Sequence, residues 1–289
     1  MNQPRGTRHF GGNMTTYPLC SETECNGEQI YPFGTCIRHL SSADQETYAT
    51  QLKRGEGALS IAFADGVDAG FVHEWIERIS TIGEDGAKVV PVDLRLEHSI
   101  LINELRFVNT QFTRSLNLTG LKVPRIYIDG GFINGRLTLD YAVVESEIAL
   151  VGYTQVSDRP YLQIDELTMS GCEAQHFGLQ RSIVKKRLEA GKLKVETGTI
   201  IRDVKIQGPA NFGDARLCEP DKYVSISAEF EGSVDFSKCK FLGHTRFGRE
   251  PDLVPSIFKG DVKFDGATFG SKSFGALVMT ECVFGAHPT

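Results

Sequence analysis

The chain has 289 residues, of which 24% are charged and 40% hydrophobic, and its formal net charge is −6. This composition is ordinary for a soluble globular protein with one large domain or two modest ones. The acidic balance argues against a protein that wraps nucleic acid electrostatically, because neutralising phosphates requires an excess of lysine and arginine, and it leaves open a binder of basic surfaces. No apolar run of about eighteen residues predicts a membrane span. Residues 1–16 lack the apolar core of a signal peptide and predict a flexible leader. We therefore expect a cytoplasmic protein.

The first motif in chain order is a cluster of metal-ligand residues. It has the pattern C-x4-C-x10-C-x2-H and consists of Cys20, Cys25, Cys36 and His39. Gly27 and Gly34 are available for the two tight turns. A structural zinc ion takes four thiolate or imidazole ligands, and clustered cysteines in a cytosolic protein are more often ligands than disulfides. The pattern predicts a structural zinc site with no position left for a substrate. The alternative is a pair of incidental buried thiols with a surface histidine.

Two helices are predicted after this motif. Residues 41–55 begin with the candidate N-caps Ser42 and Asp44. Residues 67–81 have one apolar face, made by Phe71, Trp75 and Ile79. That face needs a partner, and the open end of a repeat fold needs a cover. We expect residues 17–88 to form one Cys/His and helical module that caps the remaining chain.

From about residue 89, large apolar residues recur every five or six positions. The clearest runs are Phe107, Phe112, Leu118, Val123, Ile128, Ile133, Leu139, Val144 and Leu150, and later Phe230, Phe236, Phe241, Phe247, Phe258, Phe264 and Phe269. Most have a small or apolar residue two positions earlier and a polar residue between. Such a triplet is a short strand that sends two side chains inward and one outward.

Short sides and corners repeated at a fixed period predict a polygonal β-solenoid with coils about 4.8 Å apart. A β-sandwich would show longer strands every eight to twelve residues. Glycines at the corners, such as Gly232, Gly243 and Gly260, predict positive φ angles there. We expect one set of phenylalanines to be buried on the axis, namely Phe236, Phe241, Phe264 and Phe269.

Three interruptions break this spacing. Residues 173–198 predict a short amphipathic helix that projects from one edge and carries Lys185, Lys186 and Arg187. Residues 218–225 and 248–257 predict proline-containing loops. Insertions in solenoids often lie on the binding face, and the alternative is that these three are neutral decorations. The basic cluster is likewise either a solvated helix face or a contact surface.

The last coil is apolar and has no helix after it to cover its strand edges. Its apolar residues include Phe274, Leu277, Met279, Val283 and Phe284. An uncapped end pairs readily with other chains, so we expect a homodimer in which two such coils meet across a two-fold axis. The alternative is that the tail after Gly285 folds back as a plug.

The repeat resembles that of pentapeptide-repeat proteins. The resemblance is clearest in AEFEGSVDFSKCKF (228–241) and FKGDVKFDGATFG (258–270), and it extends from near Val90 to Phe284. It implies a mainly β fold for residues 89–289, a right-handed, quadrilateral parallel β-helix with about four repeats per coil. The alternating spacing departs from the family and predicts coils of about 22 residues. Some members carry a similar Cys-rich leader, and dimers of the expected kind occur among them.

The sequence favours a binding function over catalysis. No phosphate loop, nucleophile elbow or HExxH motif occurs, so we expect no enzyme activity, no catalytic residue and no bound organic cofactor. We expect a protein–protein interaction scaffold or regulator with a protein partner and no direct nucleic-acid binding. The first alternative is a DNA mimic, since some pentapeptide-repeat proteins resemble duplex DNA and occupy DNA gyrase. A continuous negative stripe is interrupted by Arg106, Lys205, Lys240, Arg246 and Lys263. The second alternative is a β-helix enzyme.

Overall fold

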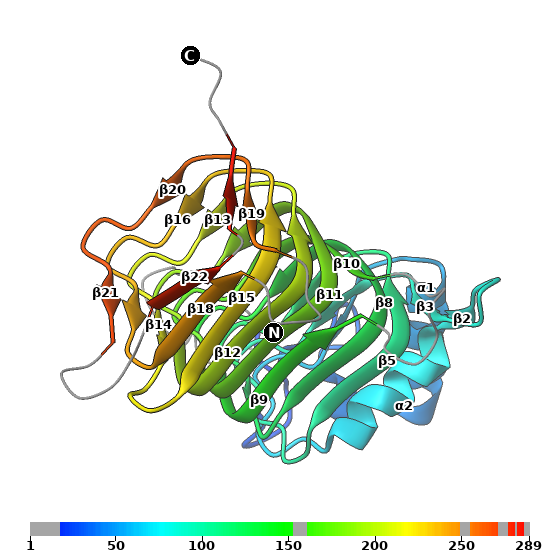
Figure 1. Ribbon diagram of the computed structural model, residues 1–289. Coiled ribbons are helices and arrows are strands. Elements are labelled where there is room, and N and C mark those ends of the chain that lie inside the picture. The colour runs from blue at the N-terminus through cyan, green and yellow to red at the C-terminus, as the bar shows by residue number, and fades with distance from the viewer. Residues whose placement is uncertain (1–17, 153–160, 249–254, 271–276, 281, 286–289) are drawn as a thin grey trace.

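The repeat forms a four-sided parallel β-solenoid of about eight turns. The computed structural model describes residues 18–152, 161–248, 255–270, 277–280 and 282–285. Figure 1 shows the turns stacked from the helices at the N-terminal end to β20–β23 at the other end. The predicted leader, Phe274 and residues 249–254 of the third interruption lie outside the described residues.

The five-to-six spacing places successive large residues on successive sides. Phe107 on the first side pairs in register with Ile128 one turn later, and Phe112 on the second side pairs with Ile133. Val123 on the fourth side pairs with Val144. Residues of this ladder are almost fully buried. The predicted solenoid and its inward register are therefore confirmed.

The strands are of two kinds, long ones that run through more than one side and short ones confined to one side. The long strands are β5 (Leu105–Phe112), β8 (Ile126–Thr138), β9 (Val143–Val151), β10 (Leu162–Thr168), β11 (Glu173–Glu189), β12 (Lys194–Ile206) and β15 (Tyr223–Phe230). The short strands of the middle turns are β6 (Leu116–Asn117), β7 (Lys122–Val123), β13 (Ala210–Asn211), β14 (Arg216–Cys218), β16 (Val234–Asp235), β17 (Lys240–Phe241) and β18 (His244–Gly248). The last turn and a half contains β19 (Ile257–Phe258), β20 (Val262–Lys263), β21 (Thr268–Phe269), β22 (Leu277–Thr280) and β23 (Val283–Phe284).

Phenylalanine rings stack from turn to turn in the C-terminal half. Phe241 lies 4.8 Å from Phe269, measured between ring centroids, and Phe236 lies 5.2 Å from Phe264. These distances match the spacing of neighbouring strands, so each ring covers the one before it. Phe236 and Phe241 are fully buried as predicted, whereas Phe264 and Phe269 are half-buried because they lie in the last turns.

The helix predicted within residues 173–198 does not form. Residues Glu173–Glu189 are strand β11, which pairs with β9, β10, β12 and β13. The five-to-six spacing in fact continues there through Leu179, Val184, Ala190 and Val195, all of them buried. The prediction was wrong because small and β-branched residues occupy the inward positions, and KKRLE taken alone favours a helix. The basic residues Lys185–Arg187 consequently lie at a corner of the solenoid, between its second and third sides.

The corner glycines serve close packing. Gly232 and Gly260 do not have positive φ angles. They stack at the corner between the second and third sides, where a Cβ on Gly232 would lie 2.5 Å from the backbone carbon of Gly208. Positive φ angles occur instead at two other corners. They lie between the first and second sides, as at Asn109 and Arg181, and between the third and fourth sides, as at Tyr141 and Lys192. The predicted reason for these glycines was therefore wrong.

The N-terminal unit covers the first turn. Strand β1 (Ala58–Ser60) already pairs with β4 (Asp93–Arg95), so the solenoid begins before residue 89. Helix α1 (Ser42–Lys53) is capped by Ser41, whose side chain accepts from the Asp44 amide, so neither predicted candidate, Ser42 or Asp44, is the N-cap. Helix α2 (Ala69–Ile79) buries Trp75 and Ile79, and its His73 ring contacts Phe107 of the first side.

The remaining elements of this unit are short. They are the 3-10 helix η1 (Ile37–His39), β2 (Thr81–Ile82) and β3 (Lys88–Val90). Within the described residues, α1 and α2 have 12 and 11 residues, and neither has the length and apolar character of a membrane-spanning helix.

Candidate metal centre

Short backbone turns bring the four predicted ligands together. An antiparallel bridge between Leu19 and Glu28 closes a loop that carries Cys20 and Cys25. After a second bridge, the chain enters η1, in which the His39 amide donates to the Cys36 carbonyl at 2.9 Å. A 3-10 turn has three residues, so it places Cys36 and His39 on the same side.

The side chains of these residues meet at one point. The Nδ1 atom of His39 lies 3.3 Å from the Cys20 Sγ and 3.5 Å from the Cys36 Sγ, and the Sγ atoms of Cys25 and Cys36 are 3.5 Å apart. All four ligand atoms lie within 4.8 Å of one another. Tetrahedral bonds of about 2.0–2.3 Å place ligand atoms roughly 3.5–3.8 Å apart. The cluster therefore fits a metal ion.

Gly27 is required for this arrangement because it leaves room for two ligands. A Cβ at this position would lie 2.8 Å from the Cys36 Cβ and 2.9 Å from its Sγ. The Gly27 amide also donates to the Cys25 Sγ at 3.4 Å. The predicted turn glycine thus has a packing role, while Gly34 has the positive φ of 78° expected of a turn.

The thiols of the cluster have opposite electrostatic environments. Burial opposes ionisation of Cys20, but hydrogen bonds from the backbone of Cys36 and Glu22 and from the His39 side chain lower its pKa to about 7. Burial raises the pKa of Cys36 to about 12, and the neighbouring Cys25 and Cys20 thiols contribute in the same direction. Collecting several thiolates in this buried space requires a cation to offset their repulsion.

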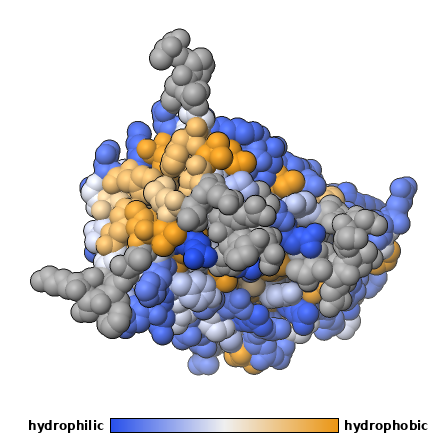
Figure 2. All heavy atoms as spheres, in the orientation of Figure 1, coloured by the Kyte–Doolittle hydropathy of each residue, from blue (hydrophilic) through white to orange (hydrophobic). Residues whose placement is uncertain are grey.

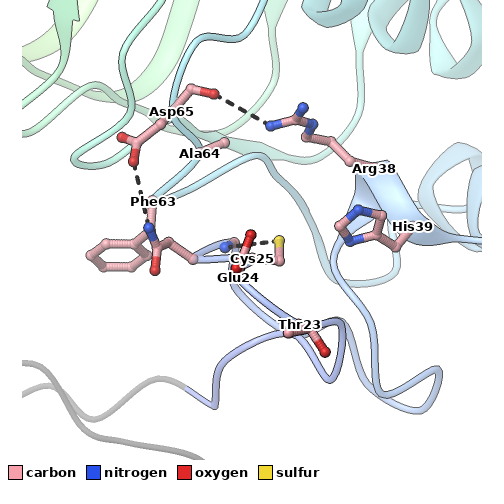
Figure 3. Close-up of a pocket in the computed structure, with 10 residues that line it drawn as sticks. Thr23, Glu24, Cys25, Arg38, His39, Phe63, Ala64 and Asp65 are labelled. Atoms are coloured by element: carbon pink, nitrogen blue, oxygen red, sulfur yellow. Dashed lines mark hydrogen bonds between the residues drawn. The ribbon is translucent and has the colours of Figure 1, made fainter.

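A cleft of about 270 Å³ opens beside two of the ligands. Figure 3 shows Cys25 and His39 on this cleft, together with Arg38, Phe63 and Asp65. Arg38 Nη1 donates to the Asp65 carbonyl at 3.3 Å. By contrast, Cys20 and Cys36 are 2% and 3% exposed. The cluster therefore has a buried half and a half that faces the solvent.

A buried polar group joins the Cys/His cluster to the solenoid. Glu28 is only 9% exposed, accepts a hydrogen bond from the Ser60 hydroxyl and lies 3.3 Å from Arg95 Nη1. Arg95 also binds Glu97 at 3.0 Å. Ser60 and Arg95 belong to β1 and β4, so this network fixes the cluster to the first turn.

An aromatic chain connects the same cluster to the helices. The Phe33 ring lies 6.1 Å from Tyr48 on α1, which lies 5.7 Å from Trp75 on α2. The Tyr48 hydroxyl donates to the Ala58 carbonyl. It also accepts a hydrogen bond from the Ser60 amide, and burial raises its pKa to about 12. Tyr48 thereby satisfies backbone groups on the outer edge of β1.

The structure brings together all four predicted ligands, and it also identifies residues that the sequence did not single out. Glu28, Ser60 and Arg95 are far apart in the chain and have no motif, so no local signal in the sequence could have identified them. The other four cysteines lie away from this cluster, and Cys172, Cys218 and Cys239 are fully buried in the solenoid.

No protein-family model matches the chain, and no match was found among curated proteins or among solved structures.

Proposed function

We propose that the protein is a non-enzymatic scaffold or regulator that binds a protein partner through the walls of its solenoid. The observation that carries this proposal is the fold itself, a stack of about eight turns with rows of outward polar side chains in register. Each turn contacts its neighbours, so the stack presents extended surfaces. Because the metal cluster needs reduced thiols, a cytoplasmic location is part of the proposal.

Partner capture tests this function. The tagged protein, cross-linked in cells of its source and isolated, should retain a defined protein in stoichiometric amount, as measured by mass spectrometry. The same chain unfolded and refolded without metal is the control for the N-terminal unit. Turnover of a substrate that depended on a side chain in one of the clefts would contradict the proposal.

We propose zinc as the ion of the Cys20, Cys25, Cys36 and His39 cluster. Three thiolates and one imidazole are a donor set typical of structural zinc, and all four positions are taken by protein. The ion would hold the loop of residues 20–39 against the first turn. Its role is structural, since no ligand position remains for water or substrate.

Metal analysis and a matched pair of variants test the zinc assignment. We expect one zinc per chain in the purified protein and loss of zinc in Cys36→Ser. Cys282→Ser is the control, because Cys282 is a half-buried thiol in the last turn. Zinc removal should also change the fluorescence of Trp75, the single tryptophan, while the circular dichroism of the solenoid persists. Far less than one zinc per chain would refute the assignment.

We also propose that the chain forms a homodimer through its last turn. In the part of the chain that the structure describes, strands β20 to β23 pair only with the preceding turn. Figure 2 shows apolar side chains gathered over this end of the solenoid. The exposed residues are Leu277, Met279, Val283 and Phe284, each 41% to 54% exposed. A second copy across a two-fold axis would cover both apolar ends at once.

Light scattering tests the dimer. The wild type should have about twice the chain mass of 31.9 kDa, and the double variant Met279→Lys, Phe284→Asp should have half that value. The control is Ile82→Lys, which changes a residue that is 68% exposed at the opposite end. A monomeric wild type at low micromolar concentration would contradict the proposal.

The ring columns and the four-sided turn also support a distant relationship to the pentapeptide-repeat proteins. This relationship is part of the proposal, as is its less favoured consequence, a DNA mimic. The mimic requires a continuous negative surface, and exposed cations such as Lys186 and Arg136 interrupt it. The scaffold is therefore the function that we favour.

A further inference from the structure

A basic strip lies across the corner between the second and third sides. It consists of Arg136 on β8 and of three consecutive residues on β11, namely Lys185, Lys186 and Arg187. Strand β10 runs between β8 and β11 and pairs with both. It contributes the only two carboxylates that these cations contact among the described residues, those of Asp165 and Glu166.

The pairing within the strip leaves positive charge in excess. Asp165 lies 2.9 Å from the Lys186 Nζ and 3.6 Å from the Lys185 Nζ. Glu166 Oε2 lies 2.9 Å from the Arg136 Nη2 and 3.8 Å from the Arg187 Nη2. Two carboxylates thus serve four cations, so the strip has a local excess of two positive charges in a chain whose net charge is −6.

The cations also lie outside the carboxylates. The four basic side chains are 40% to 61% exposed, whereas Asp165 and Glu166 are 14% and 26% exposed. The carboxylates therefore orient the cations from the side of the protein interior. The cations present a positive surface to the solvent. At the same corner, the turn that follows β11 has the uncharged residues Gln207, Gly208 and Pro209. The preceding turn adds the exposed Arg114, which donates to the Gly55 carbonyl.

A second ion cluster provides the contrast. Lys205 and Lys259 contact Glu229 and Glu231 at 2.6–3.7 Å, with two cations for two carboxylates. These four charges cancel. Charged side chains on the same solenoid thus form one neutral cluster and one positive strip.

We propose that the basic strip binds an acidic protein segment, a run of aspartate and glutamate residues in the partner of the scaffold. This inference rests on the proposed function and names the chemistry of the partner. Carboxylates would bind the arginines bidentately and displace the weak contacts at 3.6 and 3.8 Å. A nucleic acid fits less well, since a long polyanion would extend beyond the strip over an acidic protein.

The test is binding of fluorescein-labelled octaglutamate, measured by fluorescence anisotropy at low salt. The double variant Lys186→Ala, Arg187→Ala should lower the affinity at least tenfold. The control Lys205→Ala, Lys259→Ala loses the same two charges from the neutral cluster, and it should change the affinity less than twofold. The wild-type affinity should fall steeply as salt is raised, because the contacts are exposed. If the double variant does not fold, the single Lys186→Ala should show the same direction of change, since Lys186 is the most exposed of the four.

Three outcomes would overturn the inference. They are no peptide binding by the wild type, equal losses in both double variants, and stronger binding of a short DNA duplex than of octaglutamate. Zinc content, dimer mass and partner capture do not depend on this peptide. A failed peptide experiment with those properties intact would refute the acidic partner and leave the scaffold proposal standing.

Discussion

Replacement of Phe241 by alanine tests whether the stacked rings hold the solenoid together. Its side chain is fully buried, and its ring centroid lies 4.8 Å from that of Phe269, 5.6 Å from Phe236 and 5.7 Å from Phe247. The paired backbones of β17 and β21 fix the walls around the ring, so the space cannot collapse when the ring is removed. We expect Phe241→Ala to lower the free energy of unfolding by about 3–5 kcal/mol.

Two further variants set the scale of this effect. Lys240→Ala changes the outward neighbour and should alter the free energy of unfolding by about 0.5 kcal/mol or less. Phe269→Ala removes a half-buried ring, and its cost should fall between the other two. The order of the three costs follows from burial alone, since all three residues lie in the same ladder.

The assay must separate the local from the global effect, because turns of a solenoid interact mainly with their neighbours. In thermal unfolding followed by circular dichroism, the melting temperature of Phe241→Ala should be roughly 5–15 °C below that of the wild type. Hydrogen exchange should be measured by mass spectrometry in Phe241→Ala and in the wild type. The substitution should accelerate exchange more in β16–β18 than in β5 and β8. Equal costs for Phe241→Ala and Lys240→Ala would show that the inward register is wrong.

Two other predictions concern a corner and a buried histidine. Gly232→Ala should lower the free energy of unfolding by more than about 2 kcal/mol, because its Cβ would lie 2.5 Å from the Gly208 backbone. Gly178→Ala should be tolerated, since its nearest contact is a flexible glutamine 3.4 Å away. Similar melting temperatures for the two variants would contradict this interpretation. Burial lowers the pKa of His73 below its usual 6.5, and the nearby positive charge of Lys88 lowers it further by a smaller amount. The unfolded chain therefore binds more protons just below pH 6.5, and stability should fall as the pH decreases through that value. His73→Gln should reduce this loss, as measured by melting temperature between pH 7.5 and 5.5, and an unchanged pH dependence would argue against it.

The sequence alone determined the solenoid, its inward residues and the four residues of the Cys/His cluster. Each side of the solenoid has a fixed length and ends in a corner, so the spacing determines which residues face the axis. The burial of Phe236 and Phe241 was therefore predictable. The clustering of these four residues was predictable because a single element of three residues joins Cys36 to His39, and several thiols in one short segment commonly lie together.

The tertiary structure decided the features that depend on neighbouring turns. Residues 173–189 are a strand because β9, β10 and β12 supply hydrogen bonds on both sides, which outweighs the local helix preference of KKRLE. The same stacking sets Lys186 above Asp165 and packs Gly232 against Gly208. Each of these contacts joins residues about 20 or more positions apart. Which residues meet depends on the number of residues in a whole turn, including any inserted residues. No local pattern in the sequence specifies that number.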